Sequence, residues 1–70
     1  MQRFEIGLYN KTVRDLLGEG ERHKHLDDSW ADVHYVDVTA ASEDEARSKI
    51  ARRYPERDGY VISSVVADRY

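Results

Sequence analysis

The chain of 70 residues contains no cysteine, so neither a disulfide framework nor a thiolate metal site can stabilise it. It has one proline, four glycines and no low-complexity tract. No apolar run approaches the roughly 20 residues that a membrane-spanning helix needs, so no membrane partner is expected. The amino terminus lacks the pattern of a signal peptide, and we therefore expect the protein in the cytoplasm.

Charged residues, by contrast, make up 36% of the chain, and its net charge is −3. Five tyrosines, one tryptophan and many valines supply the aromatic and β-branched side chains that disordered chains lack. We expect a single folded domain over residues 1–70, near the lower size limit for independent folding. The mild acidity argues against a general nucleic-acid binder.

Three segments have the pattern of β-strands. Phe4, Ile6 and Leu8 alternate with polar residues or glycine, which is the two-residue period of a half-buried strand. A second alternating segment covers residues 31–40, and an apolar run covers residues 60 to about 66. The sequence therefore predicts three strands.

The main helix is predicted to begin after Ser42. Ser42 and Glu45, three positions apart, form a capping box that satisfies two backbone donors. Acidic residues fill the first turn and basic residues follow, which complements the helix dipole. Ala46, Ile50 and Tyr54 form a narrow apolar stripe, and a proline follows the helix. This stripe is the face expected to pack on the sheet.

A long connection over residues 10–31 joins the first two strands. Asn10 is suited to cap a helix, and three apolar residues follow it at helical spacing, so a short helix or a few turns is expected there. Residues 18–28 are polar and are expected to form a loop. Trp30 is expected to be half-buried and to close this loop onto the sheet.

These elements predict a small α+β fold with one main helix. The strand–helix–strand unit joins parallel strands with a right-handed crossover. The first strand then lies between the other two and antiparallel to both, which gives the spatial order 2-1-3. This arrangement is a split βαβ unit, half of a ferredoxin-like domain, with the helix on one face of the sheet.

The second face of this sheet carries apolar side chains that the main helix does not cover. Such a patch rarely stays exposed on a soluble monomer, so either the 10–30 segment, slightly favoured, or a second chain should cover it. Both outer strands also present unpaired backbone groups, which permits pairing at a strand edge. The residues expected to bind a partner on this face are Tyr9, Val33, Tyr35, Val61 and Val65.

A basic, histidine-containing cluster lies in the predicted loop. Imidazole nitrogens are ligands that zinc, nickel or copper accept, but two histidines do not complete a four-ligand zinc site, so no metal residue is assigned. The same cluster is suited to contact an anion instead. Its residues are Arg22, His23, Lys24 and His25.

A second basic group lies at the end of the main helix and just beyond it. These side chains are suited to contact nucleic-acid phosphates. Several acidic residues lie close by in the sequence, and a solvated helix face with ion pairs explains the same pattern. The group consists of Lys49, Arg52, Arg53 and Arg57.

No catalytic signature is present. The serines lie in no nucleophile elbow, adjacent carboxylates do not converge on one atom, and there is no glycine-rich phosphate loop. We expect no enzyme activity, no catalytic residue and no cofactor. The predicted function is a small accessory or regulatory interaction module that binds another protein, or itself, through the second sheet face or a strand edge. Nucleic-acid association is the alternative, and metal binding by the histidine loop a weaker one.

Overall fold

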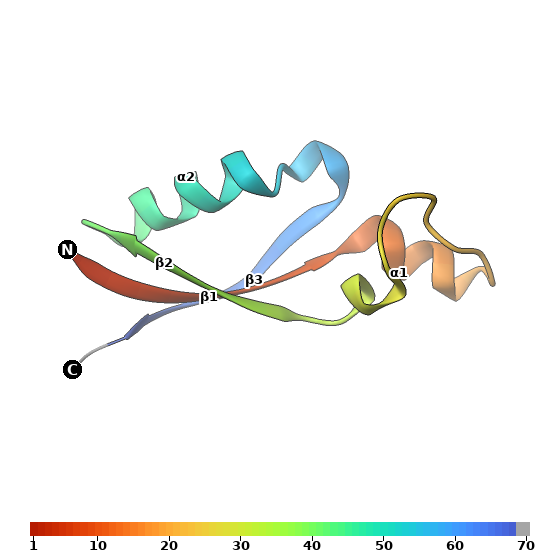
Figure 1. The fold of residues 1–70 in the computed structure, drawn as a ribbon, viewed down its shortest axis with the longest axis horizontal. Coiled ribbons are helices and arrows are strands. Elements are labelled where there is room, and N and C mark those ends of the chain that lie inside the picture. The colour runs from red at the N-terminus through yellow and green to blue at the C-terminus, as the bar shows by residue number, and fades with distance from the viewer. Residues whose placement is uncertain (69–70) are drawn as a thin grey trace.

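Three strands and one long helix form the body of the protein in the computed structural model, which describes residues 1–68 (Figure 1). A shorter helix and two 3-10 turns complete it. In chain order the elements are β1 (Gln2–Asn10), α1 (Lys11–Gly18), η1 (Asp28–Ala31), β2 (His34–Ala40), α2 (Glu43–Arg53), η2 (Glu56–Asp58) and β3 (Tyr60–Asp68). Within the part of the chain that is described, no helix is long and apolar enough to cross a membrane.

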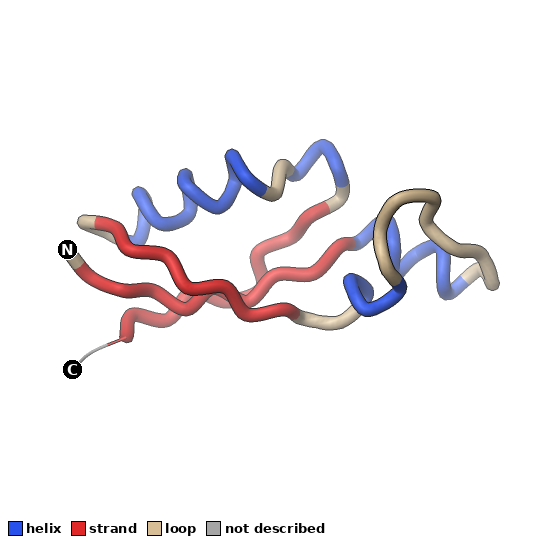
Figure 2. The backbone as a smooth tube through the Cα atoms, in the orientation of Figure 1, coloured by secondary structure: helices blue, strands red, loops and turns tan. Residues whose placement is uncertain are grey.

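The sheet has the predicted topology. Its strand order is β2-β1-β3, and β1 is antiparallel to both neighbours. In Figure 2, α2 runs along one face of the strands and no described helix runs along the other. The predicted α+β fold with an open three-stranded sheet is therefore confirmed.

The core lies between β1 and α2. Phe4, Ile6 and Leu8 of β1 are 3%, 0% and 1% exposed, as their alternation predicts, and they cluster with Ala46 and Ile50 of α2. The hydroxyl of the N-cap residue Ser42 accepts the Glu45 N–H at 3.2 Å. The capping signal thus starts α2 where its apolar stripe meets the sheet.

Asn10 ends β1 and starts α1. It is fully buried, its side-chain oxygen accepts the Val13 N–H at 3.0 Å, and its amide nitrogen donates to the Asp58 carbonyl at 3.0 Å. A further backbone bond of 2.7 Å joins Lys11 N–H to the Gly59 carbonyl. These bonds fix α1 to the turn before β3, at the end of the sheet.

The connection over residues 10–31 therefore extends the molecule lengthwise (Figure 1). The slightly favoured prediction that this segment folds over the second sheet face is wrong, because the bonds of Asn10 place α1 beyond the strand ends. The second strand also begins later than expected, at His34, because Asp27 caps the 3-10 turn of Asp28–Ala31 by accepting the Ser29 N–H at 3.2 Å.

A β-bulge divides β3 into two halves. Leu8 pairs with Ile62 and Gly7 pairs with Ser64, so Ser63 is an extra residue in β3. The Ser63 hydroxyl donates to the Gly7 carbonyl at 3.1 Å. An extra residue reverses the alternation of the strand beyond it. Val65, predicted on the second face, consequently packs against the core cluster, and that prediction is wrong.

Candidate functional site

The second sheet face carries three of the exposed large apolar side chains among residues 1–68. We call it the open face and define it by Val33, Tyr35 and Val66, which are 36%, 65% and 56% exposed. Gly7 of β1 pairs with Tyr35 on one side and with Ser64 on the other, so both outer strands contribute to the same surface.

Gly7 lies at the centre of the open face and has no side chain to cover it. A Cβ added there would lie 2.6 Å from Ser64 Oγ and 3.1 Å from Val33 Cγ1, so these two side chains lean over the glycine. Tyr35 stands beside this low point. The resulting surface is one projecting aromatic ring next to a floor of small and branched side chains.

Two of the predicted partner-binding residues are less accessible than expected. Tyr9 is half-buried under the Arg14 guanidinium, whose central carbon lies 3.7 Å from the ring centroid. Arg14 Nε also donates to the Ala31 carbonyl at 2.9 Å, which holds α1 against η1 at this end of the face. Val61, paired with Tyr9, is half-buried as well.

Val66 takes the place on the open face that the sequence pattern assigned to Val65. The signal for this exchange is the pair Ser63-Ser64, two small polar residues that interrupt the apolar run where the bulge forms. Of the five predicted residues, the structure brings Val33 and Tyr35 together as exposed side chains.

Charged residues border the open face at the end remote from α1. Glu5 pairs with Asp37 of β2 and with Val66 of β3, so two carboxylates share a row with Val66, next to the row formed by Tyr35, Gly7 and Ser64. Arg3 follows in the next row, opposite Thr39. An apolar centre with a charged rim is the usual composition of a protein-binding patch.

The loop that contains Arg22, His23, Lys24 and His25, here called the histidine loop, has its turn fixed by a side-chain hydrogen-bond acceptor. His23 Nδ1 accepts the N–H groups of His25 and Leu26, both at 3.0 Å. In the neutral ring the proton therefore resides on Nε2, and Nδ1 is not free to ligate a metal. Among residues 1–68, no group of three or more His, Cys, Asp or Glu is arranged to hold a metal ion.

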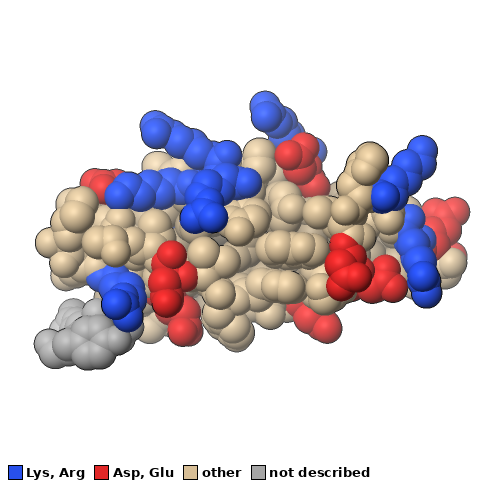
Figure 3. Space-filling model, in the orientation of Figure 1, with Lys and Arg blue, Asp and Glu red and all other residues tan. Residues whose placement is uncertain are grey.

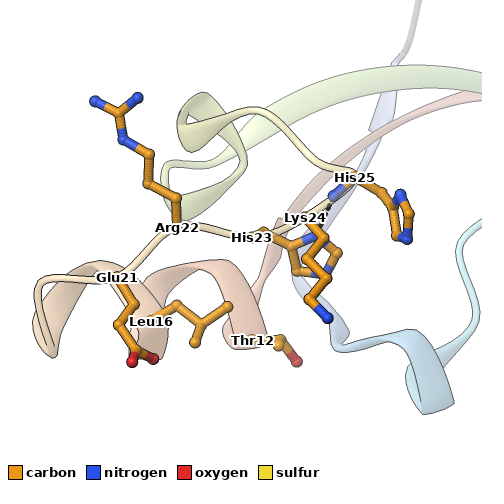
Figure 4. Close-up of a pocket in the computed structure, with 7 residues that line it drawn as sticks. All are labelled: Thr12, Leu16, Glu21, Arg22, His23, Lys24 and His25. Atoms are coloured by element: carbon orange, nitrogen blue, oxygen red, sulfur yellow. Dashed lines mark hydrogen bonds between the residues drawn. The ribbon is translucent and has the colours of Figure 1, made fainter.

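The four predicted loop residues line one hollow of about 660 Å³ between the loop and α1 (Figure 4). Thr12 and Leu16 form its floor. Figure 4 shows the Arg22 side chain pointing away from the hollow, and its Nε lies 3.7 Å from Asp28. Glu21 contributes a carboxylate to the same hollow. The loop is thus a mixed-charge surface and not a purely basic one.

The basic residues near the end of α2 are partly engaged in local pairs. Lys49 Nζ lies 3.2 Å from Glu45 and donates to the Thr39 carbonyl at 2.7 Å. The Arg53 guanidinium carbon lies 5.7 Å from the Tyr54 ring centroid. Figure 3 shows basic side chains projecting along α2 with acidic ones beside them. Lys49 therefore lies against β2, apart from Arg57 on η2.

Trp30 closes the end of the core, as predicted. It is half-buried, stacks on His34 with centroids 4.1 Å apart, and meets Tyr60 edge-on at 5.3 Å. Burial raises the pKa of Tyr60, and Tyr54 and Asp58 add to the shift. The hydrogen bond from Ser29 lowers the pKa of Asp27, the cap of η1. The ring contacts of Trp30 join η1 to β2 and β3.

No protein-family model matches the chain, and neither a curated protein nor a solved structure is significantly similar to it. The geometry of the surfaces described above is the basis for a functional proposal.

Proposed function

We propose that the chain is a small, non-enzymatic accessory or regulatory module that binds another protein through the open face. The exposed ring of Tyr35, 65% accessible and on the same face as two exposed valines, is the observation that carries this proposal. Aromatic side chains at the centre of a patch are frequent anchors of protein interfaces.

Burial of the exposed apolar side chains of the open face against a partner is energetically favourable. Burying Tyr35, Val33 and Val66 would contribute on the order of 3–5 kcal/mol before the costs of association. The carboxylates of Glu5 and Asp37 border the patch, so the fitting partner has an apolar contact surface with a basic margin. Such a partner would satisfy both the apolar centre and the acidic row.

A non-enzymatic role agrees with where the displaced pKa values occur. Asp27 belongs to the cap of a 3-10 turn and Tyr60 to a packed aromatic cluster. Perturbed titratable groups that serve catalysis gather in one cleft with a role for each. Here each shift has a structural cause of its own.

Site-specific photo-crosslinking tests the proposal. A photoreactive phenylalanine analogue is placed at Tyr35 or at Val66, with Arg52 of α2 as the control position, and each chain is exposed to an extract of its source cells. We expect positions 35 and 66 to yield the same discrete adduct and position 52 to yield none. An adduct from position 52 alone, or no adduct from the open face, would refute the proposal.

A further inference from the structure

We propose that protonation of His23 opens the histidine loop over residues 22–26, so that this loop is a pH-sensitive switch. The neutral ring of His23 fixes the turn of the loop, and the protonated ring cannot. The switch lies beyond the strand ends, at the α1 end of the molecule, and does not depend on the binding proposed for the open face.

A single nitrogen atom holds the turn. His23 Nδ1 accepts the N–H groups of His25 and Leu26, both at 3.0 Å (Figure 4). Among the residues that the structure describes, no other hydrogen bond engages the backbone of residues 22–26. Arg22 adds an ion pair at 3.7 Å, but its side chain is 84% exposed, and exposed pairs of this kind contribute little. The conformation of the loop therefore depends on an unprotonated Nδ1.

Both ends of the loop are anchored without His23. At its start, the Glu21 N–H donates to the Leu16 carbonyl of α1 at 2.8 Å. At its end, the Asp27 carboxylate accepts a backbone N–H of η1 at 3.2 Å. Loss of the two bonds to His23 would therefore open residues 22–26 and leave α1 and η1 in place.

Protonation removes both bonds at once. An imidazolium ring carries a proton on each nitrogen and is a donor only. A proton on Nδ1 would also point at the two N–H groups that this atom accepts in the closed loop. Opening is therefore coupled to uptake of a proton, and the open form gains population as pH falls. Imidazole side chains change charge between about pH 5 and 8, which is the range in which the switch would operate.

The charges around the ring do not offset this effect. Two hollows meet at His23, one of about 660 Å³ toward α1 and one of about 450 Å³ toward η2. The charged and titratable groups that line them are Glu21, Arg22, Lys24 and His25 of the loop segment, Arg57 and Asp58 of η2, and Tyr60 of β3. Three permanent cations and two carboxylates leave no excess of negative charge to stabilise a protonated His23 in the closed loop. Because His23 lines both hollows, opening would change the shape of the two together.

A titration from about pH 8 to about pH 5, followed by NMR, tests the switch. The resonances recorded are those of His23 Nδ1 and of the His25 and Leu26 amides. We expect both amides to shift with the midpoint of His23 Nδ1, and their protection against solvent exchange, corrected for the pH dependence of exchange itself, to fall about tenfold or more. Amides of α1 should keep their protection. Loop amides that do not titrate, or that follow a different midpoint, would overturn the proposal.

Matched variants assign the effect to His23. His23→Asn retains a side-chain acceptor for N–H groups two and three residues ahead but does not titrate, so its loop should stay closed at both pH values. His23→Ala has no acceptor, and its loop should be open at both. His25→Ala removes the neighbouring imidazole and should leave the titration of the Leu26 amide unchanged.

Three outcomes of these variants would contradict the switch. In the first, the Leu26 amide titrates in His23→Asn as it does in the unchanged chain. In the second, it no longer titrates in His25→Ala. In the third, His23→Ala protects the loop amides at about pH 8 as well as the unchanged chain does, which would mean that the two bonds do not hold the turn.

Discussion

Replacement of Asn10 should be the most destabilising polar substitution in the chain. The side chain is 0% exposed and makes two hydrogen bonds, one to cap α1 and one to the Asp58 carbonyl, 48 residues away in sequence. Asn10→Ala removes both bonds. The informative partner variant is Asn10→Asp, which has nearly the same shape but cannot donate when it is ionised.

The expected loss in the free energy of unfolding of Asn10→Ala follows from the two hydrogen bonds that it removes. Loss of a helix cap costs about 1 kcal/mol. Leaving the Asp58 carbonyl without its donor costs a further 1–3 kcal/mol, roughly, if water does not replace the donor. Asn10→Ala should therefore lower the free energy of unfolding by about 2–4 kcal/mol. A domain of this size has on the order of 4–10 kcal/mol in total, so the loss is large.

Asn10→Asp should keep the bond to Val13 and lose the one to Asp58 at neutral pH. Burial raises the pKa of the introduced carboxyl above its unfolded value. The folded state then binds the proton more tightly, so the associated stability is present at low pH and is lost as pH rises through the raised pKa. The free energy of unfolding of Asn10→Asp should therefore approach that of the unchanged chain as the solution is acidified.

Urea unfolding followed by the fluorescence of Trp30, the single tryptophan, measures both effects. Curves are recorded at neutral pH and at about pH 4, near the unfolded pKa of aspartate. An Asn10→Ala variant within about 0.5 kcal/mol of the unchanged chain would refute the reasoning, since that is the range of ordinary surface substitutions. The reasoning would also be refuted if Asn10→Asp lowered the free energy of unfolding by the same amount at both pH values.

Three further substitutions test other parts of the fold. Gly59→Ala should cost about 2–4 kcal/mol in urea unfolding, because the glycine has φ +97° and an added Cβ would collide with the Thr12 hydroxyl. Wild-type stability against urea should fall above about pH 10 and that of Tyr60→Phe should fall less, because the raised pKa of Tyr60 gives stability that is lost as pH rises through it. An equal fall in both proteins would contradict this. Val65→Lys should lower the thermal midpoint strongly and Val66→Lys only slightly; the reverse order would contradict the bulge.

The sheet order and the main helix could be predicted because local signals determine them. Alternation in β1 assigns one face to the core, and Ser42 with Glu45 fixes the start of α2. A strand–helix–strand crossover then leaves β1 in the centre. Each of these features depends on residues close together in sequence.

The exact composition of the open face could not be predicted in the same way. Val61-Ile62 and Val65-Val66 are two apolar pairs, and either phase of alternation fits each pair equally well. The phase in the second pair depends on Ser63 being accommodated as a bulge opposite Gly7, which is set by pairing with β1. A register of this kind is a property of two strands and not of one.

The position of the 10–31 connection depends on contacts even more distant in sequence. Asn10 could be recognised as a helix cap, but its second bond, to Asp58, is what fixes α1 at the end of the sheet. The turn at His23 likewise depends on the ring nitrogen accepting two backbone N–H groups, a role that composition alone does not reveal.

The most direct test of the open face is the free energy of unfolding of Tyr35→Lys, measured together with the photo-adduct formed from position 66. Val36→Lys, on the opposite side of the same strand, is the matched control. Tyr35 is 65% exposed, so we predict a change in stability within about 0.5 kcal/mol and loss of the adduct. Destabilisation as large as that of Val36→Lys, with the adduct unchanged, would mean that Tyr35 stabilises the fold and does not bind a partner.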